Sequence, residues 1–315
     1  ALRAIGAMPR IGFGWSAWLT SWRHPGVQRV LGQMAPALLG VSAAQLSLLI
    51  NTQIASHVGV GAVSWLTFAD RLMEFPTALL GVALGVVLVP HLASARAAGD
   101  EAGYSKLLDW GLRLIVVLAL PCAVALLVFP QALVAVLFHY GAFGADDVAQ
   151  TVRALQGYGV GLIGLAAVKI LAAGFYARED MKTPMRVGVA ALVLTQAMNA
   201  VFVPQLGHAG LALSIGLAAL FNATALLVLL RRRGLYQAEP GWTALALRVG
   251  AGCLALGGAL WWAARDIDWI GLQAAPLQRA GLIAAVLAGW RCSTSRCWRC
   301  AGCAWATWYG ARPPY

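Results

Sequence analysis

The stretch "FADRLMEFPTALLGVALG", Phe68 to Gly85, lies inside a run of apolar residues that is long enough to cross a bilayer. It nevertheless carries three charged residues within five positions, Asp70, Arg71 and Glu74. Charged side chains in the middle of a membrane are costly, and they usually face the interior of a helix bundle or a water-filled cavity. The stretch therefore predicts both a membrane-spanning helix and a task for its charged residues.

The composition of the whole chain agrees with a membrane protein. Of its 315 residues, 60% are hydrophobic and only 11% are charged, whereas about a quarter of the residues in a soluble domain are charged. Hydrophobic stretches of about 20 residues also recur along the chain, which is typical of transmembrane helices. We therefore predict an all-α integral membrane protein, folded as a polytopic helix bundle.

The formal net charge of +11 raises the question of nucleic-acid binding. In a membrane protein, however, Lys and Arg collect in cytoplasmic loops because of the way in which helices are inserted. The sequence has no basic stripe on a soluble fold, which is what a nucleic-acid-binding domain would present. We expect no nucleic-acid partner.

Hydropathy predicts eight membrane spans. A short helix and loop at the membrane face is predicted for "PQALVAVLFHYGAF", between the third and fourth spans. Lys and Arg are concentrated before the first span and after each even-numbered one, and this alternation places both termini in the cytoplasm. The predicted spans are 31–56, 61–89, 108–129, 155–177, 185–204, 209–230, 243–264 and an eighth that starts near 277.

The chain opens with Ala1 rather than Met and shows no signal peptide, so we expect a fragment whose start lies elsewhere. The predicted spans divide the chain into four segments. The segments are an interfacial or cytoplasmic N-terminal part (1–27), a six-helix transmembrane lobe (28–230), two additional transmembrane helices of which the last is incomplete (231–290), and an aberrant tail rich in Arg, Cys and Trp (291–315).

The tail interrupts the eighth predicted helix before it reaches the roughly 20 apolar residues that a span needs. One interpretation is a metal or cluster site, because the C-x4-C-x2-C-x2-C pattern resembles an iron–sulfur run. The other is out-of-frame translation, since GC-rich DNA read in a wrong frame yields Arg, Cys, Trp and Pro. We favour the second and expect no metal or cofactor, because nothing else in the chain calls for one. The cysteines concerned are Cys292, Cys297, Cys300 and Cys303.

The charges in the second span lie on one side of their helix, near the middle of the membrane. If the helix starts near Gly61, Asp70 lies roughly 14 Å into a hydrocarbon core about 30 Å thick. Spacings of three and four residues bring Arg71 and Asp70 to the same side as Glu74. The group could be an ion cluster that only fixes packing, or a cavity site in which Arg71 binds an anion. We favour the cavity site, because a guanidinium offers two parallel donors to a phosphate.

Other residues inside the spans suggest helix contacts and bends. Pro76 removes a backbone hydrogen bond and can kink the second span just below the charges, while Gly81 permits close helix contact. Lys169 could snorkel towards the cytoplasmic face or line the same cavity, and Asn51 could line it as well. Polar residues of the first, fifth and sixth spans most often hold helices together; they are Asn51, Gln53, Thr195, Gln196, Asn199, Asn222 and Thr224.

Five stretches carry a family resemblance: "LLINTQIAS", "VSWLTFADRLMEFPTALLGVALGVVLVPHLA", "DWGLRL", "YGVGLIGLAAVKILAAGFYAREDMKTP" and "HAGLALSIGLAALFNA". In this order they resemble the MurJ (MviN) lipid II flippase family of Gram-negative bacteria. The resemblance runs from about Arg29 to Ala288. It covers only the C-terminal part of that family, namely one six-helix lobe and two additional helices.

The resemblance implies a fold and a mechanism. Family members belong to the multidrug/oligosaccharidyl-lipid/polysaccharide (MOP) exporter superfamily and have two lobes around a central cationic cavity. They carry undecaprenyl-diphosphate-linked peptidoglycan precursor from the inner to the outer leaflet by alternating access. The family's essential charged cluster matches Asp70, Arg71 and Glu74. By that match Arg71 would contact the lipid diphosphate, the two acids would hold Arg71 and take part in gating, and the last two helices would form a groove for the polyprenyl tail.

The resemblance also implies partners and a location. These are lipid II, membrane lipids and the cell-wall synthesis machinery, in the bacterial inner membrane. Some relatives bind sodium through carboxylates on helices equivalent to the first and fifth spans. This chain has no Asp or Glu on those spans, so we do not expect sodium coupling through that pocket. The polar residues there are Gln45, Asn51, Thr195 and Asn199.

Three alternative functions stay open beside the flippase. A drug or cation exporter of the same superfamily would lack a preference for diphosphate and would tolerate Lys at Arg71. A non-transporting scaffold for cell-wall assembly would use the charges only for packing. A lipid-phosphate hydrolase would need a nucleophile–base or His site, and we expect no enzyme because the His residues lie at or near loops, far apart. They are His24, His57, His91, His139 and His208.

Overall fold

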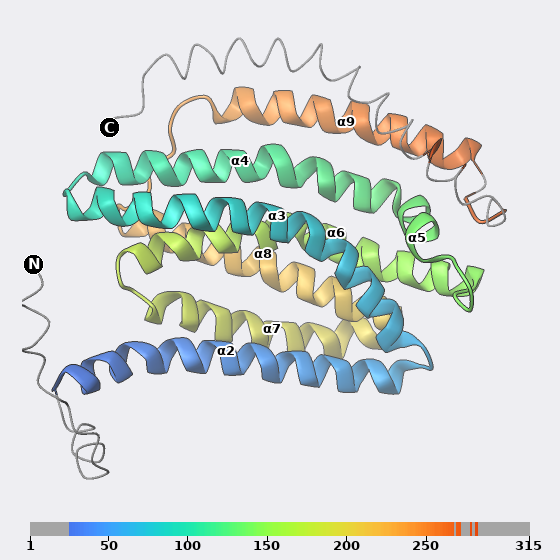
Figure 1. The fold of residues 1–315 in the computed structure, drawn as a ribbon, viewed down its shortest axis with the longest axis horizontal. Helices are drawn as coiled ribbons and strands as arrows, with labels where there is room; N and C mark the ends of the chain where they lie inside the picture. The colour runs from blue at the N-terminus through green and yellow to red at the C-terminus, as the bar shows by residue number, and fades with distance from the viewer. Residues whose placement is uncertain (1–24, 268, 272–277, 279–280, 283–315) are drawn as a thin grey trace, which may run out of the picture.

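The computed structural model describes residues 25–267, 269–271, 278 and 281–282. The long helices lie side by side in a single bundle (Figure 1). This arrangement confirms the predicted all-α class. The helices, labelled as in Figure 1, are α2 (Pro25–Val58), α3 (Ala62–Ala97), α4 (Glu101–Val128), α5 (Pro130–Phe138), α6 (Ala145–Ala177), α7 (Lys182–Leu206), α8 (His208–Arg232) and α9 (Trp242–Asp266).

Each of the first seven predicted spans coincides with a long helix, and α5 is the short helix predicted between the third and fourth spans. Among the described residues, five helices are long and apolar enough to cross a membrane, namely α4, α6, α7, α8 and α9. The chain is therefore a multi-pass membrane protein. The tail 291–315 lies outside the described residues, as do residues 1–24 and all of the eighth predicted span except 278, 281 and 282.

Helix α6 begins earlier than hydropathy predicted, at Ala145 rather than 155. The reason is local capping: the carboxylate of Asp147 accepts a hydrogen bond from the backbone N–H of Gly144 at 2.9 Å. A carboxylate at a helix N-terminus is also favoured by the helix dipole. The same carboxylate accepts a hydrogen bond from the indole N–H of Trp65 at 2.8 Å, which attaches the start of α6 to α3.

Helix α6 is the centre of the bundle and is buried along most of its length. It packs most closely against α8, through Gly157, Gly161 and Gly164. A Cβ atom on Gly161 would lie only 2.1 Å from the Cα atom of Gly216 on α8. Small residues of this kind let membrane helices approach until their backbones touch. Helices α3, α4, α5 and α7 pack against this tightly fitted pair, while α9 lies on α4 and α2 mainly on α7.

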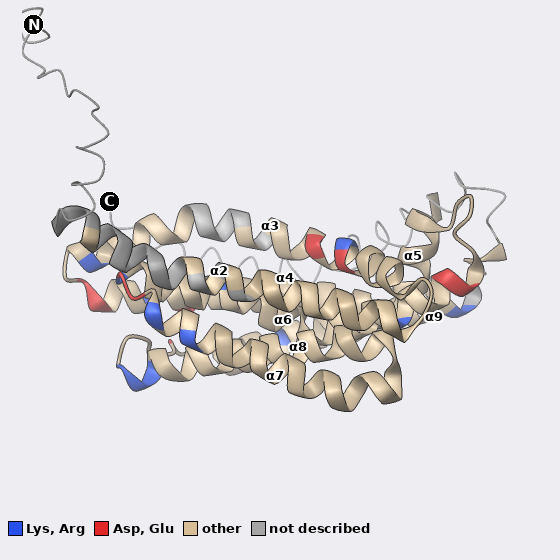
Figure 2. Ribbon diagram, turned by 90° about the horizontal axis from the view of Figure 1, so that it is seen from below, with Lys and Arg blue, Asp and Glu red and all other residues tan. Residues whose placement is uncertain are grey.

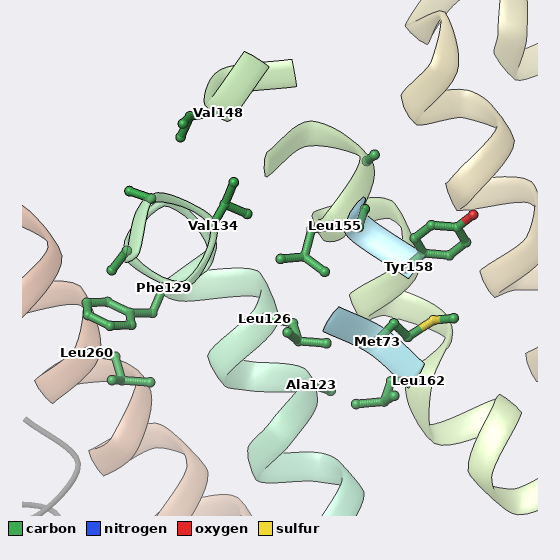
Figure 3. Packing of buried hydrophobic residues seen from close by; sticks show 14 of the residues in the cluster. Met73, Ala123, Leu126, Phe129, Val134, Val148, Leu155, Tyr158, Leu162 and Leu260 are labelled. Carbon is green, nitrogen blue, oxygen red and sulfur yellow. The ribbon is translucent and has the colours of Figure 1, made fainter. Parts of the chain in front are cut away.

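A second layer of packing joins α3, α4, α5, α6 and α9 near one end of the bundle. Figure 3 shows Leu126 of this cluster facing Leu155 and Met73, and Phe129 beside Leu260. Tyr158 lies at its edge, with the ring against the cluster and the hydroxyl pointing away from it (Figure 3). The apolar contacts thus fix the segment of α3 that carries Met73, and with it the neighbouring charged residues.

The turn between α6 and α7 is held by Asp180. Its carboxylate accepts hydrogen bonds from the backbone N–H of Thr183 at 3.0 Å, from the Thr183 hydroxyl at 2.6 Å and from the Arg233 guanidinium at 2.6 Å. Burial raises the pKa of Asp180, but these hydrogen bonds outweigh it and hold the pKa below its usual value of 3.8. The turn therefore depends on an ionised carboxylate.

We expect Asp180→Asn to destabilise the protein by about 1 kcal/mol at pH 7, a typical value for a lost helix-capping carboxylate. Because the pKa is lowered on folding, this stability is complete above the unfolded pKa and is lost as pH falls through the folded pKa. The gap between the two proteins should therefore close below about pH 4. Thermal unfolding at pH 7 and pH 3 measures it, with Glu179→Gln, at the exposed neighbouring position of the same turn, as control. A gap that is the same at both pH values would contradict this account.

Candidate functional site

Asp70, Arg71 and Glu74 of α3 project from the bundle into open space. The guanidinium of Arg71 and the carboxylate of Glu74 form an ion pair at 3.1 Å, with 70% and 57% of their side chains exposed. Asp70, one residue before Arg71, is exposed as well. Most charged residues of the described chain lie near helix ends, whereas these lie partway along α3 (Figure 2). An ion pair so exposed contributes little to stability, which argues against a purely structural role.

All three charged residues line one cavity of about 1190 Å³. Its walls come from α2, α3, α6, α7 and α8. The volume exceeds the 300–1,000 Å³ of ordinary small-molecule pockets. Among the described residues, Asp70, Arg71 and Glu74 are the only charged ones in its wall, so this wall carries one basic group against two acids. An anion therefore binds here only if it draws Arg71 away from Glu74 or if further basic groups complete the site.

The opposite wall of the cavity is neutral and partly polar, and Asn51 lies in it. The side-chain oxygen of Asn51 accepts hydrogen bonds from Asn199 at 2.9 Å and from Gln196 at 3.2 Å. These bonds join α2 to α7, which is the interhelical role that the sequence predicted for the amides. The other polar neutral residues of the cavity wall are Ser47, Thr52, Thr67, Tyr158, Tyr176, Thr195 and Asn222.

Lys169 lies at the contact between α3 and α6 and is not among the residues that line the cavity. Its amine donates a hydrogen bond to the backbone carbonyl of Thr77 at 2.9 Å. The sequence analysis predicted that Lys169 would extend to the cytoplasmic face or line the cavity. In the structure its amine binds α3 instead. Pro76, the residue before Thr77, lies inside α3, and the helix continues through it to Ala97.

One buried polar centre had no role in the sequence analysis. Asp109 of α4 is only 1% exposed, and its carboxylate accepts hydrogen bonds from Arg113 at 2.6 Å, Tyr236 at 2.8 Å and the indole of Trp242 at 2.7 Å. Arg113 in turn donates to the backbone carbonyls of Glu239 and Pro240, both at 2.9 Å. The segment between α8 and α9 is thereby attached to α4. Asp109 and Arg113 are four residues apart near the start of a predicted span, and this spacing was the signal in the sequence for an ion pair on that helix.

Comparisons of the sequence with known proteins agree with one another. A family model described as "Lipid II flippase MurJ" matches residues 2–270. The chain is 51% identical over 286 residues to the lipid II flippase MurJ of Burkholderia cenocepacia, an alignment that covers 91% of this chain and 55% of that protein. It is 35% identical over 266 residues to the probable lipid II flippase MurJ of Vibrio cholerae, covering 83% of this chain and 50% of that protein. The chain thus spans about half the length of these relatives.

Solved structures give the same fold. The structure entitled "Lipid II flippase MurJ, inward closed conformation" superposes with a TM-score of 0.65 at 17% identity, over 84% of this chain and 55% of that one. An outward-facing multidrug resistance MATE family transporter of the MOP superfamily superposes with a TM-score of 0.55 at 15% identity, over 82% and 63% of the two chains. At such identities the likeness shows the fold alone. With the family model and the sequence relatives, it establishes that this chain belongs to the lipid II flippase MurJ family.

Proposed function

We propose that this chain is the C-terminal portion of a lipid II flippase. The whole protein would move undecaprenyl-diphosphate-linked peptidoglycan precursor from the inner to the outer leaflet by alternating access, binding its substrate without cleaving it. One observation carries the proposal beyond family membership. Arg71 lies partway along α3, with Asp70 and Glu74 beside it, and all three side chains line one cavity. Within the described bundle these side chains are largely exposed, as expected for charges that meet a substrate in a cavity.

Arg71 would contact the diphosphate. Between transport cycles, Asp70 and Glu74 would hold the Arg71 side chain. The Arg71–Glu74 pair is mostly exposed, and such pairs contribute about 0–1 kcal/mol. A diphosphate has several charged oxygens and accepts two parallel hydrogen bonds from a guanidinium, so it competes well with a single carboxylate. Glu74 would therefore occupy Arg71 until the substrate arrives.

The site needs basic groups from the rest of the protein. Within the described residues, the cavity wall carries two acids and one base, which is unfavourable for a diphosphate. The chain spans about half the length of its curated relatives. We therefore expect the missing part to supply the other basic groups, and we expect no flipping by residues 1–315 alone.

The location and partners follow from the same proposal. The protein would lie in the bacterial inner membrane with both termini in the cytoplasm, beside the cell-wall synthesis machinery. The described loops support this orientation. Basic residues gather around the turns that join α3 to α4 and α6 to α7, and at the end of α8, as expected for the cytoplasmic side; most lie in the adjoining helix ends, and they include Arg96, Lys106, Arg178, Lys182 and Arg232.

A chimaera tests the proposal. The part of the Burkholderia cenocepacia relative that has no counterpart here is joined to this chain, and lipid II in the outer leaflet is measured in cells depleted of their own flippase. We expect Arg71→Ala and Arg71→Lys to lower flipping roughly tenfold or more, because a hydrogen bond between charged groups is worth about 1.5–3 kcal/mol. The exposed Arg153→Ala serves as the matched control and should transport normally.

The two substitutions separate the alternatives. Normal flipping by Arg71→Ala, at normal protein levels, would contradict the anion-binding role altogether. Normal flipping by Arg71→Lys alone would show that any positive charge suffices at this position, as expected for an exporter without a preference for diphosphate.

A further inference from the structure

Lys169 of α6 and Gly81 of α3 form a matched pair. The lysine side chain crosses the helix at the glycine: a Cβ atom on residue 81 would lie 2.6 Å from Cδ and 2.7 Å from Nζ of Lys169. Beyond the glycine, the amine reaches the backbone carbonyl of Thr77 at 2.9 Å. The missing side chain at Gly81 therefore provides the path along which the ammonium reaches α3.

The bonded carbonyl belongs to the residue directly after Pro76, the proline inside α3. Pro76 has no N–H, so the carbonyl of Leu72, four residues earlier, loses its usual partner. The hydroxyl of Thr77 donates back to the carbonyls of Met73 and Glu74, each at 3.0 Å. Figure 1 shows that α3 changes direction along its length, its N-terminal part descending towards the end of α2. Prolines inside helices are the commonest cause of such bends.

The Asp70, Arg71 and Glu74 group of α3 lies between two polar contacts with α6. On the N-terminal side the indole of Trp65 donates to Asp147 at 2.8 Å. On the C-terminal side Lys169 binds Thr77. Between these points Asp70, Arg71 and Glu74 are exposed to the cavity. Apolar contacts of Met73 hold the segment between these two polar contacts, and the contact at Thr77 comes directly after Pro76, so the place of Arg71 over the cavity depends on both.

We propose that Lys169 is a positioning residue, which sets the bend of α3 at Pro76 and so the place of Arg71 in the cavity. An ammonium inside a membrane needs a polar partner, and the Thr77 carbonyl provides one without any acidic residue. The consequence for transport rests on the proposed function, because it presumes that Arg71 binds substrate. The consequence for the bend does not.

Two substitutions distinguish this role from a role of the charge alone. Lys169→Met removes the ammonium and keeps a long apolar stem. Gly81→Ala keeps the ammonium but blocks its path to Thr77, because the new methyl group would overlap the lysine stem. If Lys169 acts through the bend, both changes have the same effect and the double variant adds nothing, as expected for two residues acting through one contact.

The test measures a distance in the chain reconstituted in lipid nanodiscs. Spin labels are placed at Phe75 on α3 and Val193 on α7, which are 75% and 65% exposed, after the native cysteines have been replaced. The distance between the labels is measured by pulsed electron paramagnetic resonance. We expect one narrow distribution in the unmodified protein, and a shifted, broader one in Lys169→Met, in Gly81→Ala and in the double variant.

The control is Gly258→Ala in α9, where an added Cβ has no atom within 4 Å; its distribution should match that of the unmodified protein. The proposal is overturned if either single variant keeps the unmodified distribution, or if the double variant shifts by the sum of both. If Lys169→Met does not fold, Gly81→Ala decides the question, since it changes no charge. The measurement uses no lipid substrate, so its result is independent of the flippase proposal.

Discussion

Replacing Gly161 by alanine is expected to prevent the chain from forming a stable bundle. The added Cβ would lie 2.1 Å from Cα and 2.6 Å from the carbonyl carbon and oxygen of Gly216. These are backbone atoms, so no side-chain rotation relieves the overlap, and α6 and α8 must separate. Overpacking a well-filled core costs about 1–3 kcal/mol, and more where backbones must move. We expect a loss of at least about 3 kcal/mol, since α6 is the centre of the fold.

Size-exclusion chromatography and thermal unfolding in detergent measure this effect. The matched control is Gly250→Ala in α9, where nothing lies within 4 Å of the added Cβ. There the exchange should be neutral or stabilising by up to about 1 kcal/mol, because alanine favours helix more than glycine does. A Gly161→Ala protein that melts at the same temperature as the control would show that α6 and α8 tolerate a wider spacing.

The helices and the side of α3 that bears the charges could be predicted from the sequence, because both depend on local patterns. Apolar runs of about 20 residues mark spans whatever surrounds them. Spacings of three and four residues place side chains together on any helix, and Arg71 indeed pairs with Glu74 at 3.1 Å. The early start of α6 was missed because its first turns are polar, and capping by Asp147 leaves no signal in hydropathy.

The contacts between distant parts of the chain could not be predicted in this way. Lys169 reaches a carbonyl on α3 because Gly81 leaves its path open. A single sequence does not show that these two distant residues lie against each other. The excess of acids in the cavity wall likewise depends on which faces of the other four helices turn inward. Periodicity gives the faces of one helix but not their pairing with another.

The attachment of the α8–α9 segment to α4 is a further long-range contact, and removing its centre is expected to be costly. Asp109→Ala would leave the hydroxyl of Tyr236 and the indole N–H of Trp242 without the carboxylate that they share, in a site only 1% exposed. It would also remove the acid that Arg113 binds at 2.6 Å. Breaking a buried ion pair by deleting one partner costs about 3–5 kcal/mol.

Asp109→Asn separates the two contributions. Its side-chain oxygen can still accept from Tyr236 and Trp242, whereas the charge that Arg113 meets is gone. We expect it to be less damaging than Asp109→Ala, by the roughly 1–3 kcal/mol that an unsatisfied buried polar group costs. Thermal unfolding in detergent gives the order of the two variants, with the exposed Asp146→Asn as the control.

Limited trypsin digestion gives a second, local measurement. Arg231, Arg232 and Arg233 precede the attached segment, which Tyr236 and Trp242 fix to α4 through Asp109. Once the segment is released, cleavage after these arginines should accelerate well before the helix bundle unfolds, because proteases cut locally opened chain. If Asp109→Ala is cut no faster there than the unmodified protein, and melts with it, then Asp109 does not hold α9 against α4. In that case the apolar contacts between the two helices must suffice.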